Sequence, residues 1–357
     1  PLFSRTMRKL FFISIVAAAL VFWSERSSAQ AVESDQWAAT DGLGRALPGR
    51  EQTRARRDDR KVAMFYWTWH TSPITDYRRI GNITQILREH PEAIDDYDHP
   101  AWDIGGNSYF WDEPLLGYYK TTDPWVLRKH AEMLADAGVD VVFFDCTNAS
   151  LTWKSSYDVL IDVWTKAQGD GVNVPKIAFM LPFGPVDWSL VSLRQLYEDI
   201  YKPGRAENLW FYLHGKPCIM AYPDNLTDSP EDRTIRDFFT FRPGQPDIVD
   251  GPGRPDQWGW LETYPQHKFV ERPDGGCEEM VVCVAQNAND ASGGHCCAFN
   301  APGTYGRSYT QQRGQDTRED AYLYGLNIQE QWDYALQCDP DLIFVTGWNE
   351  FIAGKHI

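Results

Sequence analysis

The sequence predicts an α/β fold, a (β/α)8 TIM barrel that is truncated at its C-terminus. Two observations lead to this prediction. Short apolar runs rich in Val, Ile and Phe recur over residues 61–347 and end in polar residues, as the buried strands of a parallel sheet do. Segments with helical spacing lie between these runs, and alternating strands and helices build a parallel sheet. No glycine-rich phosphate loop follows a strand, which disfavours a doubly wound nucleotide-binding sheet.

The expected strands share a continuous apolar run. They cover residues 61–67, 140–145, 175–181, 216–222, 238–241, 280–285 and 341–347. A barrel needs eight strands, and these are seven. Either another strand lies in the irregular region 250–270, or the sequence stops before the barrel closes. We favour truncation, because a helix should follow Glu350.

Helices are expected between the strands. The clearest begins at the N-cap pair Thr122-Asp123, has Pro124 in its first turn and stops at Gly138. Further helices fit residues 156–168, 189–201 and 319–337. A long insertion, residues 74–124, separates the first two strands, and loops of this length are usually functional or lid-like.

The N-terminal residues 1–31 predict a signal peptide whose real start is Met7. A basic segment, an apolar run over residues 10–23 and the Ala29-Gln30-Ala31 site follow one another. The apolar run is too short for a good membrane span. Cleavage of the signal peptide would remove it, so we expect no stable membrane span in the mature protein. Residues 32–60 are interpreted as a polar linker and residues 61–357 as the catalytic barrel. We expect a secreted or periplasmic monomer.

The charge of the chain restricts its partners. The formal net charge is −16, which argues against nucleic acid and suits an exported enzyme acting on a neutral or cationic polymer. The arginines within residues 42–61 are therefore interpreted as part of a solvated linker. Aromatic residues make up 14% of the chain, and many stand beside loop residues, where flat rings can stack on sugars.

The chain has seven cysteines. In an exported protein, Cys277, Cys283, Cys296 and Cys297 predict one or two local disulfides, and Cys146 is expected to be a buried free thiol. The run from His295 to Cys297 could suggest a metal site, but no second Cys/His pair stands at ligand spacing. No metal and no cofactor are expected.

Carboxyl groups at the ends of the strands are the catalytic candidates. The active site of a (β/α) barrel lies at this end, and glycosidic cleavage needs two carboxyl groups. Glu350 is the strongest candidate, although it could simply be a favourable residue at a helix start. Asp145 and Glu262 are the next candidates. Asp145 could instead be a structural residue that caps the following loop, and Glu262 could be a surface residue between core tryptophans. Asp112 and Glu113 lie in the insertion; they could complete a subsite, but an ordinary solvated loop is favoured.

Aromatic, amide and imidazole side chains near the strand ends are expected to bind a carbohydrate substrate. Rings can stack on sugars, whereas amides and imidazoles can hold sugar hydroxyls. The expected substrate-binding residues are Trp67, Trp69, His70, Trp111, Asn148, Trp258, Trp260, Gln286, Asn287, Trp348 and Asn349.

Four segments resemble the family-71/family-99-like glycoside hydrolases, a group that includes endo-α-mannosidases and α-glucanases. They are Tyr66-Trp67-Thr68-Trp69, residues 137–145, Lys216-Pro217 and Trp348-Asn349-Glu350-Phe351. In the family-99 motif a first Glu assists attack by the sugar 2-hydroxyl, and a second Glu before Gly is the general acid. Glu350 matches the first. Ala353 stands at the second position, before the matching Gly354.

The resemblance therefore implies a glycoside hydrolase without the family's acid. Glu350 would act as base or nucleophile, and Glu262 or Asp145 would supply the acid. One alternative is a non-catalytic carbohydrate-binding barrel that has lost its acid. Another is a barrel glycosyltransferase, which would need a nucleotide-sugar phosphate site that the sequence does not show.

Overall fold

The computed structural model describes residues 34–53, 55–70, 81–94, 96, 98–104, 108–111, 113–297 and 301–354. The chain divides into two compact units, residues 1–56 and 57–357. The predicted signal peptide, residues 1–31, lies outside the described residues. No helix in the described part is long and apolar enough to cross a lipid bilayer.

The described part of the first unit has little regular structure. It contains the 3-10 helix η1 (Ser34–Gln36), the short helix α2 (Arg50–Thr53) and a bridge between Thr40 and Ala46. The carboxylate of Asp41 accepts bonds from two backbone N–H groups and the Arg45 side chain, which closes one turn.

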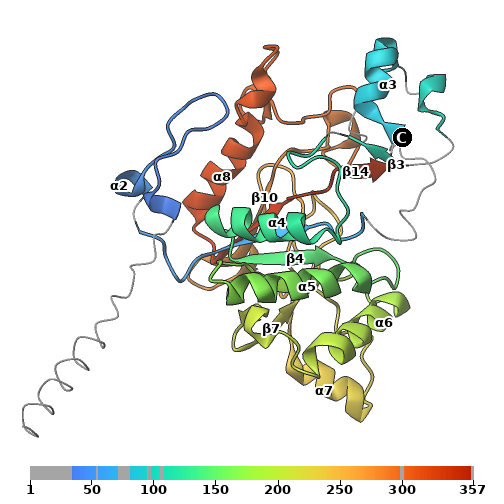
Figure 1. The fold of residues 1–357 in the computed structure, drawn as a ribbon, viewed down its shortest axis with the longest axis vertical. Coiled ribbons are helices and arrows are strands. Elements are labelled where there is room, and N and C mark those ends of the chain that lie inside the picture. Colours follow the sequence, from blue (N-terminus) through green and yellow to red (C-terminus); the bar gives the residue numbers. More distant parts are fainter. Residues whose placement is uncertain are drawn as a thin grey trace, which may run out of the picture. The chain divides into compact units, whose positions relative to one another are not determined.

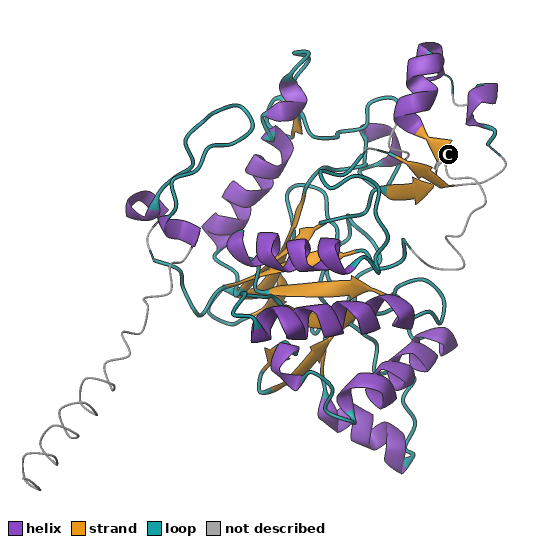
Figure 2. Ribbon diagram, in the orientation of Figure 1, coloured by secondary structure: helices purple, strands orange, loops and turns teal. Residues whose placement is uncertain are grey.

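The second unit is mixed α/β with a mostly parallel central sheet (Figures 1 and 2). The strand order is β5-β4-β1-β13-β10-β9, and only β9 runs antiparallel to its neighbour. The strands are β1 (Lys61–Tyr66), β4 (Val141–Asp145), β5 (Lys176–Met180), β9 (Phe269–Glu271), β10 (Cys277–Cys283) and β13 (Leu342–Thr346). The predicted parallel sheet is therefore confirmed.

Smaller sheets and helices complete the unit. The short strands are β2 (Gly81–Asn82), β3 (Ser108–Phe110), β6 (Tyr212–Leu213), β7 (Lys216–Ile219), β8 (Thr240–Phe241), β11 (Tyr309–Thr310), β12 (Gly314–Gln315) and β14 (Ile352–Gly354). The α-helices are α3 (Ile83–Glu89), α4 (Pro124–Asp136), α5 (Lys154–Gly169), α6 (Asp187–Leu196), α7 (Pro230–Phe238) and α8 (Leu326–Cys338). A π-helical turn, η4 (Tyr197–Tyr201), extends α6, and the 3-10 helices are η2 (Pro91–Ile94), η3 (Pro100–Trp102), η5 (Glu207–Leu209), η6 (Asp290–Ser292) and η7 (Ala321–Leu323).

Helix α4 begins and ends as its sequence predicts. The Asp123 carboxylate accepts bonds from the backbone N–H groups of Trp125 and Val126. Gly138 has φ +82°, which favours glycine, and ends the helix. Helices α4 and α5 pack against each other on one face of the sheet beside β4 (Figure 1), and the Trp164 indole of α5 donates to the Leu127 carbonyl of α4 at 2.9 Å.

The strands are buried on both faces, and alternate residues join two different core clusters. Tyr66, Val142 and Phe144 pack with the apolar residues of α4 and α5. Phe65 and Phe143 belong to the other cluster, which also contains apolar residues of β5, β10 and β13. This alternation follows from the two-residue period of a strand. The alternation therefore determines on which face of the sheet each side chain at a strand end lies.

The sheet continues beyond β5 but does not close into a barrel. Parallel bridges join Met180 to Met220 and Gly244 to Trp258. Between Trp258 and β10, no backbone bridge is present among the described residues; the Gly259 N–H donates instead to the Glu279 carboxyl at 3.0 Å. Strand β13 already pairs with β1, so the opening does not lie beside the last strand. Truncation stays a prediction.

The predicted disulfides are wrong, because all seven cysteines, each within the described residues, are free thiols. Cys277 and Cys283 begin and end β10. Their Cα atoms are therefore about 20 Å apart at the rise of a strand, far beyond the reach of a disulfide. Cys146 is buried and free, as predicted, and its Sγ donates to the Thr152 carbonyl.

Candidate functional site

The turn after β13 carries Glu350 and is fixed by its neighbours. The Trp348 N–H donates to the Phe65 carbonyl at 3.1 Å. The Asn349 amide accepts from the Trp67 N–H at 2.8 Å and donates to the Trp67 carbonyl at 3.0 Å. The Asn349 side chain thus pairs with the Trp67 backbone as a neighbouring strand would. Asn349 was predicted to bind a sugar, but its side chain instead holds the turn after β13 against the Trp67 backbone.

His70 holds the same turn from the other side. Its ring stacks on Phe351 with centroids 4.0 Å apart, and its Nε2 lies 3.0 Å from the Asn349 carbonyl oxygen. Burial lowers the pKa of His70 to about 3, so the ring is neutral. Because the carbonyl can only accept, Nε2 carries the proton and donates it.

A cavity of about 460 Å³ opens beside this turn. It holds two carboxyl groups, Glu350 and Glu113, and one guanidinium, Arg307. Four aromatic side chains and an imidazole also line it, namely Trp111, Tyr119, Trp348, Phe351 and His130. The cavity therefore brings together Glu350 and residues of the 74–124 insertion, including Glu113, for which the sequence favoured an ordinary solvated loop.

The Glu350 carboxyl is unusually basic. Solvent reaches its side chain, but protein atoms surround it closely. This desolvation, and to a smaller extent the negative charge of Asp145, raise the pKa of Glu350 to about 8. The carboxyl group is therefore mostly protonated at pH 7.

Asp145, at the end of β4, is held by hydrogen bonds inside the protein. One carboxylate oxygen accepts from the Trp69 indole at 2.8 Å, and the other accepts from the Thr147 N–H and hydroxyl at 3.0 and 2.7 Å. Burial raises the Asp145 pKa, and these three bonds oppose that rise. Asp145 is buried, so it acts on Glu350 through its charge and not through contact with a ligand in the cavity.

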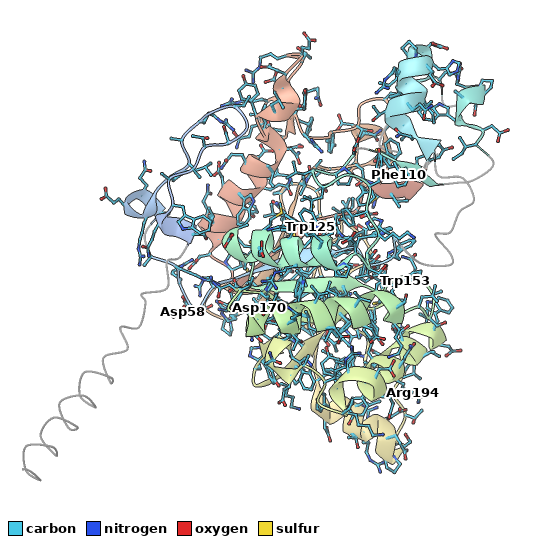
Figure 3. All side chains as sticks on the ribbon, in the orientation of Figure 1. Asp58, Phe110, Trp125, Trp153, Asp170 and Arg194 are labelled. Atoms are coloured by element: carbon cyan, nitrogen blue, oxygen red, sulfur yellow. The ribbon has the colours of Figure 1, made fainter. Side chains whose placement is uncertain are left out.

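Three tryptophans form a stack above Asp145. Trp67 and Trp69 are 3.9 Å apart and nearly parallel, and Trp69 and Trp153 are 5.2 Å apart at 2°. Trp153 immediately precedes α5 (Figure 3). The Trp67 and Trp153 Nε1 atoms are buried and have no hydrogen-bond partner in the described structure. The stack orients the indole that binds Asp145.

His130 of α4 lines the cavity as a neutral imidazole. Its Nδ1 lies 2.8 Å from the Tyr66 hydroxyl. Tyr66 is fully buried, its raised pKa keeps it protonated, and no other acceptor for its hydroxyl is found among the described residues. Tyr66 therefore donates, and the ring proton of His130 is on Nε2. Burial lowers the His130 pKa to about 4, so the ring stays neutral at pH 7.

Glu262 is not in this cavity. Its side chain is buried, and its two carboxylate oxygens lie 2.8 Å from the His267 N–H and 2.9 Å from the His267 Nδ1. Burial raises the Glu262 pKa, whereas the bonds to Glu262 raise the His267 pKa. Glu262 is therefore outside the cavity that contains Glu350, and its carboxylate is bonded to His267.

The remaining predicted ligands occupy three kinds of position. Trp258 is fully buried and donates to Glu278 at 2.7 Å, and Trp260 packs on Phe65 and Phe183. Gln286 is buried and bonded to the Glu262 carbonyl and the Asn327 amide, in a network with Gln331. The side-chain amides of Asn287 and Asn148 donate over a long distance of 3.4 Å, to the Cys297 carbonyl and the Thr147 hydroxyl respectively.

Ala353, the position of the missing family acid, lies in β14. It is in register with Tyr109 of β3, and the Trp111 N–H donates to the Phe351 carbonyl at 3.1 Å. The chain after Glu350 is thus paired with the insertion. This pairing brings Trp111 and Glu113 to the cavity, which the sequence could not show.

The solved structures that are similar to the chain include the following two. Both are of the GH99 endo-alpha-mannosidase from Bacteroides thetaiotaomicron, one of them in complex with BIS-TRIS-Propane. Each is 16% identical and covers 83% of this chain; TM-scores are 0.47 and 0.42, over 85% and 86% of the other chain. No family model and no curated protein matches the chain.

Proposed function

We propose that this protein is a glycoside hydrolase whose proton donor is Glu350. The observation that carries the proposal is the position of the Glu350 carboxyl group in an aromatic-lined cavity of about 460 Å³, where desolvation raises its pKa to about 8. A general acid must be protonated at the working pH and reachable by substrate. Glu350 meets both conditions, so the structure favours the acid role over the base or nucleophile role that the sequence suggested.

Glu113 is the second carboxyl group in the proposed mechanism. It is exposed and lines the same cavity as Glu350. Glycosidic cleavage uses one carboxylic acid to protonate the leaving oxygen and one carboxylate to activate water or attack carbon. We assign the first role to Glu350 and the second to Glu113. Asp145 keeps the proton on Glu350 by charge repulsion.

The cavity walls suit a sugar. The rings of Trp111, Tyr119 and Trp348 offer apolar faces, and His130 offers a neutral Nε2–H for a hydroxyl. A few polar groups among aromatic walls are typical of small-molecule sites. The substrate class in this proposal is a neutral oligo- or polysaccharide, and the enzyme is a secreted or periplasmic monomer.

A non-catalytic carbohydrate-binding barrel is the second candidate. The observation that favours it is the engagement of Asp145 and Glu262, whose carboxylate oxygens all contact groups of the protein. This protein would then bind a sugar in the cavity without cleaving it.

The test is a screen of neutral polysaccharides and oligosaccharides with four proteins: wild type, Glu350→Gln, Glu113→Gln and Glu319→Gln. Glu319 is exposed and outside the cavity, so it is the matched control. We expect hydrolysis by the wild type and the control, and losses on the order of 100-fold or more in the two cavity variants. Hydrolysis that survives Glu350→Gln sinks the assignment. Sugar binding without hydrolysis supports the second candidate.

A further inference from the structure

Two histidines and a glutamate meet at the surface of the 74–124 insertion. His90 follows α3, Glu92 belongs to η2, and His99 precedes η3. Glu92 Oε1 lies 3.3 Å from His90 Nδ1 and 3.3 Å from His99 Nε2. Among the residues that the structure describes, this is the one group that places three such ligand atoms within 4.8 Å of one another.

The two separations between Glu92 and the histidines match those around a tetrahedral metal ion. With bonds of about 2.0–2.1 Å to zinc, two ligands of a tetrahedron are separated by roughly 3.3 Å. The two contacts of Glu92 with His90 and His99 are long for hydrogen bonds to a carboxylate but have this separation. His90 and Glu92 are about half exposed, with side-chain exposures of 47% and 60%, so a water molecule can take the fourth position.

The sequence around the group is mostly acidic and favours a cation, with Arg88 and Lys120 as the basic residues at its two ends. Residues 89–119 contain eight Asp and Glu and neither Lys nor Arg. Imidazole nitrogens suit zinc and related transition metals, whereas Ca²⁺ and Mg²⁺ prefer sites made of oxygen ligands. The ligand set therefore points to a Zn²⁺-class ion.

The described part of the 74–124 insertion forms a small lobe, and a metal link would increase the stability of this lobe. Its satellite core consists of four buried residues, Ile83, Ala93, Trp102 and Tyr109. Small cores are commonly reinforced by a disulfide or a structural metal. A metal held by His90 and His99 would join the chain segments on either side of Ala93, close to Trp102, whose indole donates to the Ala93 and Asp96 carbonyls.

We propose that His90, Glu92 and His99 bind one Zn²⁺-class ion that reinforces this lobe. The lobe carries β3, which pairs with β14 directly after Glu350. The ion would therefore stabilise the segment that brings Trp111 and Glu113 to the cavity. This role does not depend on the proposed hydrolase activity.

Binding has a defined local cost at His99. Its Nδ1 accepts from the Ala101 N–H at 3.2 Å, which leaves the ring proton on Nε2. Coordination through Nε2 transfers the proton to Nδ1 and removes that capping bond. His90 binds through Nδ1 and keeps its proton on Nε2. We therefore expect a micromolar site and not the tighter binding of a closed four-ligand site.

The test is calorimetric titration of the full chain with ZnCl₂. We expect one ion per wild-type chain, and at least a tenfold weaker affinity in His90→Ala, Glu92→Gln and His99→Ala. His295→Ala and a Cys296→Ser/Cys297→Ser variant are the matched controls, because they remove the run His295-Cys296-Cys297, which offers another set of zinc ligands at the surface, and they should bind like the wild type. No binding at 100 μM zinc, or binding lost only in the controls, overturns the proposal.

Hydrogen exchange supplies a second readout. Zn²⁺ should slow amide exchange in residues 90–102 of the wild type and leave exchange in His99→Ala unchanged. Binding with no change in this segment overturns the reinforcing role. Because neither experiment uses a sugar, failure of the hydrolase proposal would leave both results interpretable.

Discussion

Replacing Asn349 by alanine separates a positioning role from a sugar-binding role. The amide makes two bonds to the Trp67 backbone, at 2.8 and 3.0 Å, and both residues are buried. Alanine leaves one N–H and one carbonyl without partners. Each orphaned buried group costs about 1–3 kcal/mol, so the variant should lose roughly 2–6 kcal/mol of its free energy of unfolding.

Urea unfolding followed by tryptophan fluorescence measures this loss. Asn148→Ala is the matched control, because Asn148 is exposed and has one long contact, and it should change stability by less than about 0.5 kcal/mol. If Asn349→Ala is as stable as this control but binds sugar more weakly, the positioning argument is refuted and the sugar-ligand interpretation stands.

Three further predictions concern the fold and its thiols. Asp123→Ala removes the N-cap of α4 and should cost about 1 kcal/mol in urea unfolding; no loss would show that the cap is dispensable. Arg242→Met should cost about 3–5 kcal/mol, because it leaves the Glu278 carboxylate buried without its bidentate partner, and a neutral result would contradict the buried pair. Without reductant, thiol titration should count seven free thiols after unfolding, and fast reaction of the native protein should map to Cys296; a count of five or fewer would restore a disulfide.

The main sheet could be predicted because its strands carry a strong local pattern. The runs at 61–67, 140–145 and 341–347 became β1, β4 and β13 within one or two residues. Each is continuous, β-branched or aromatic, and buried on both faces. Asp123 and Gly138 likewise mark the ends of α4 by local chemistry alone.

Helix α7 was missed because it lacks an apolar stripe. Only Asp232 and Ile235 are buried along it. Arg194 of α6 donates to both oxygens of Asp232, at 2.9 and 2.7 Å, so an ion pair between two helices holds this element. Ser229, whose hydroxyl caps the helix, and Pro230 after it were the available sequence signals.

The candidate site could be predicted in part. Glu350 was identified by its position after a strand. Glu113 was considered only as a residue that could complete a subsite, because it stands in a loop. His130 was not identified, because it lies on the buried face of a helix. Their approach to Glu350 depends on β14 pairing with β3 and on α4 packing beside the turn after β13. Such contacts between distant segments leave no local pattern in the sequence.

The protonation state of Glu350 is the central claim and can be measured directly. In protein labelled with ¹³C at the glutamate side-chain carboxyl, the Glu350 signal is identified by its loss in Glu350→Gln and followed from pH 4 to 10. We expect a midpoint near the pKa of about 8, so the proton is present at pH 7 and is lost as the pH rises through 8. Asp145→Asn should lower that midpoint, because it removes a negative charge. A midpoint near the ordinary value of 4.5 would contradict the assignment of Glu350 as proton donor.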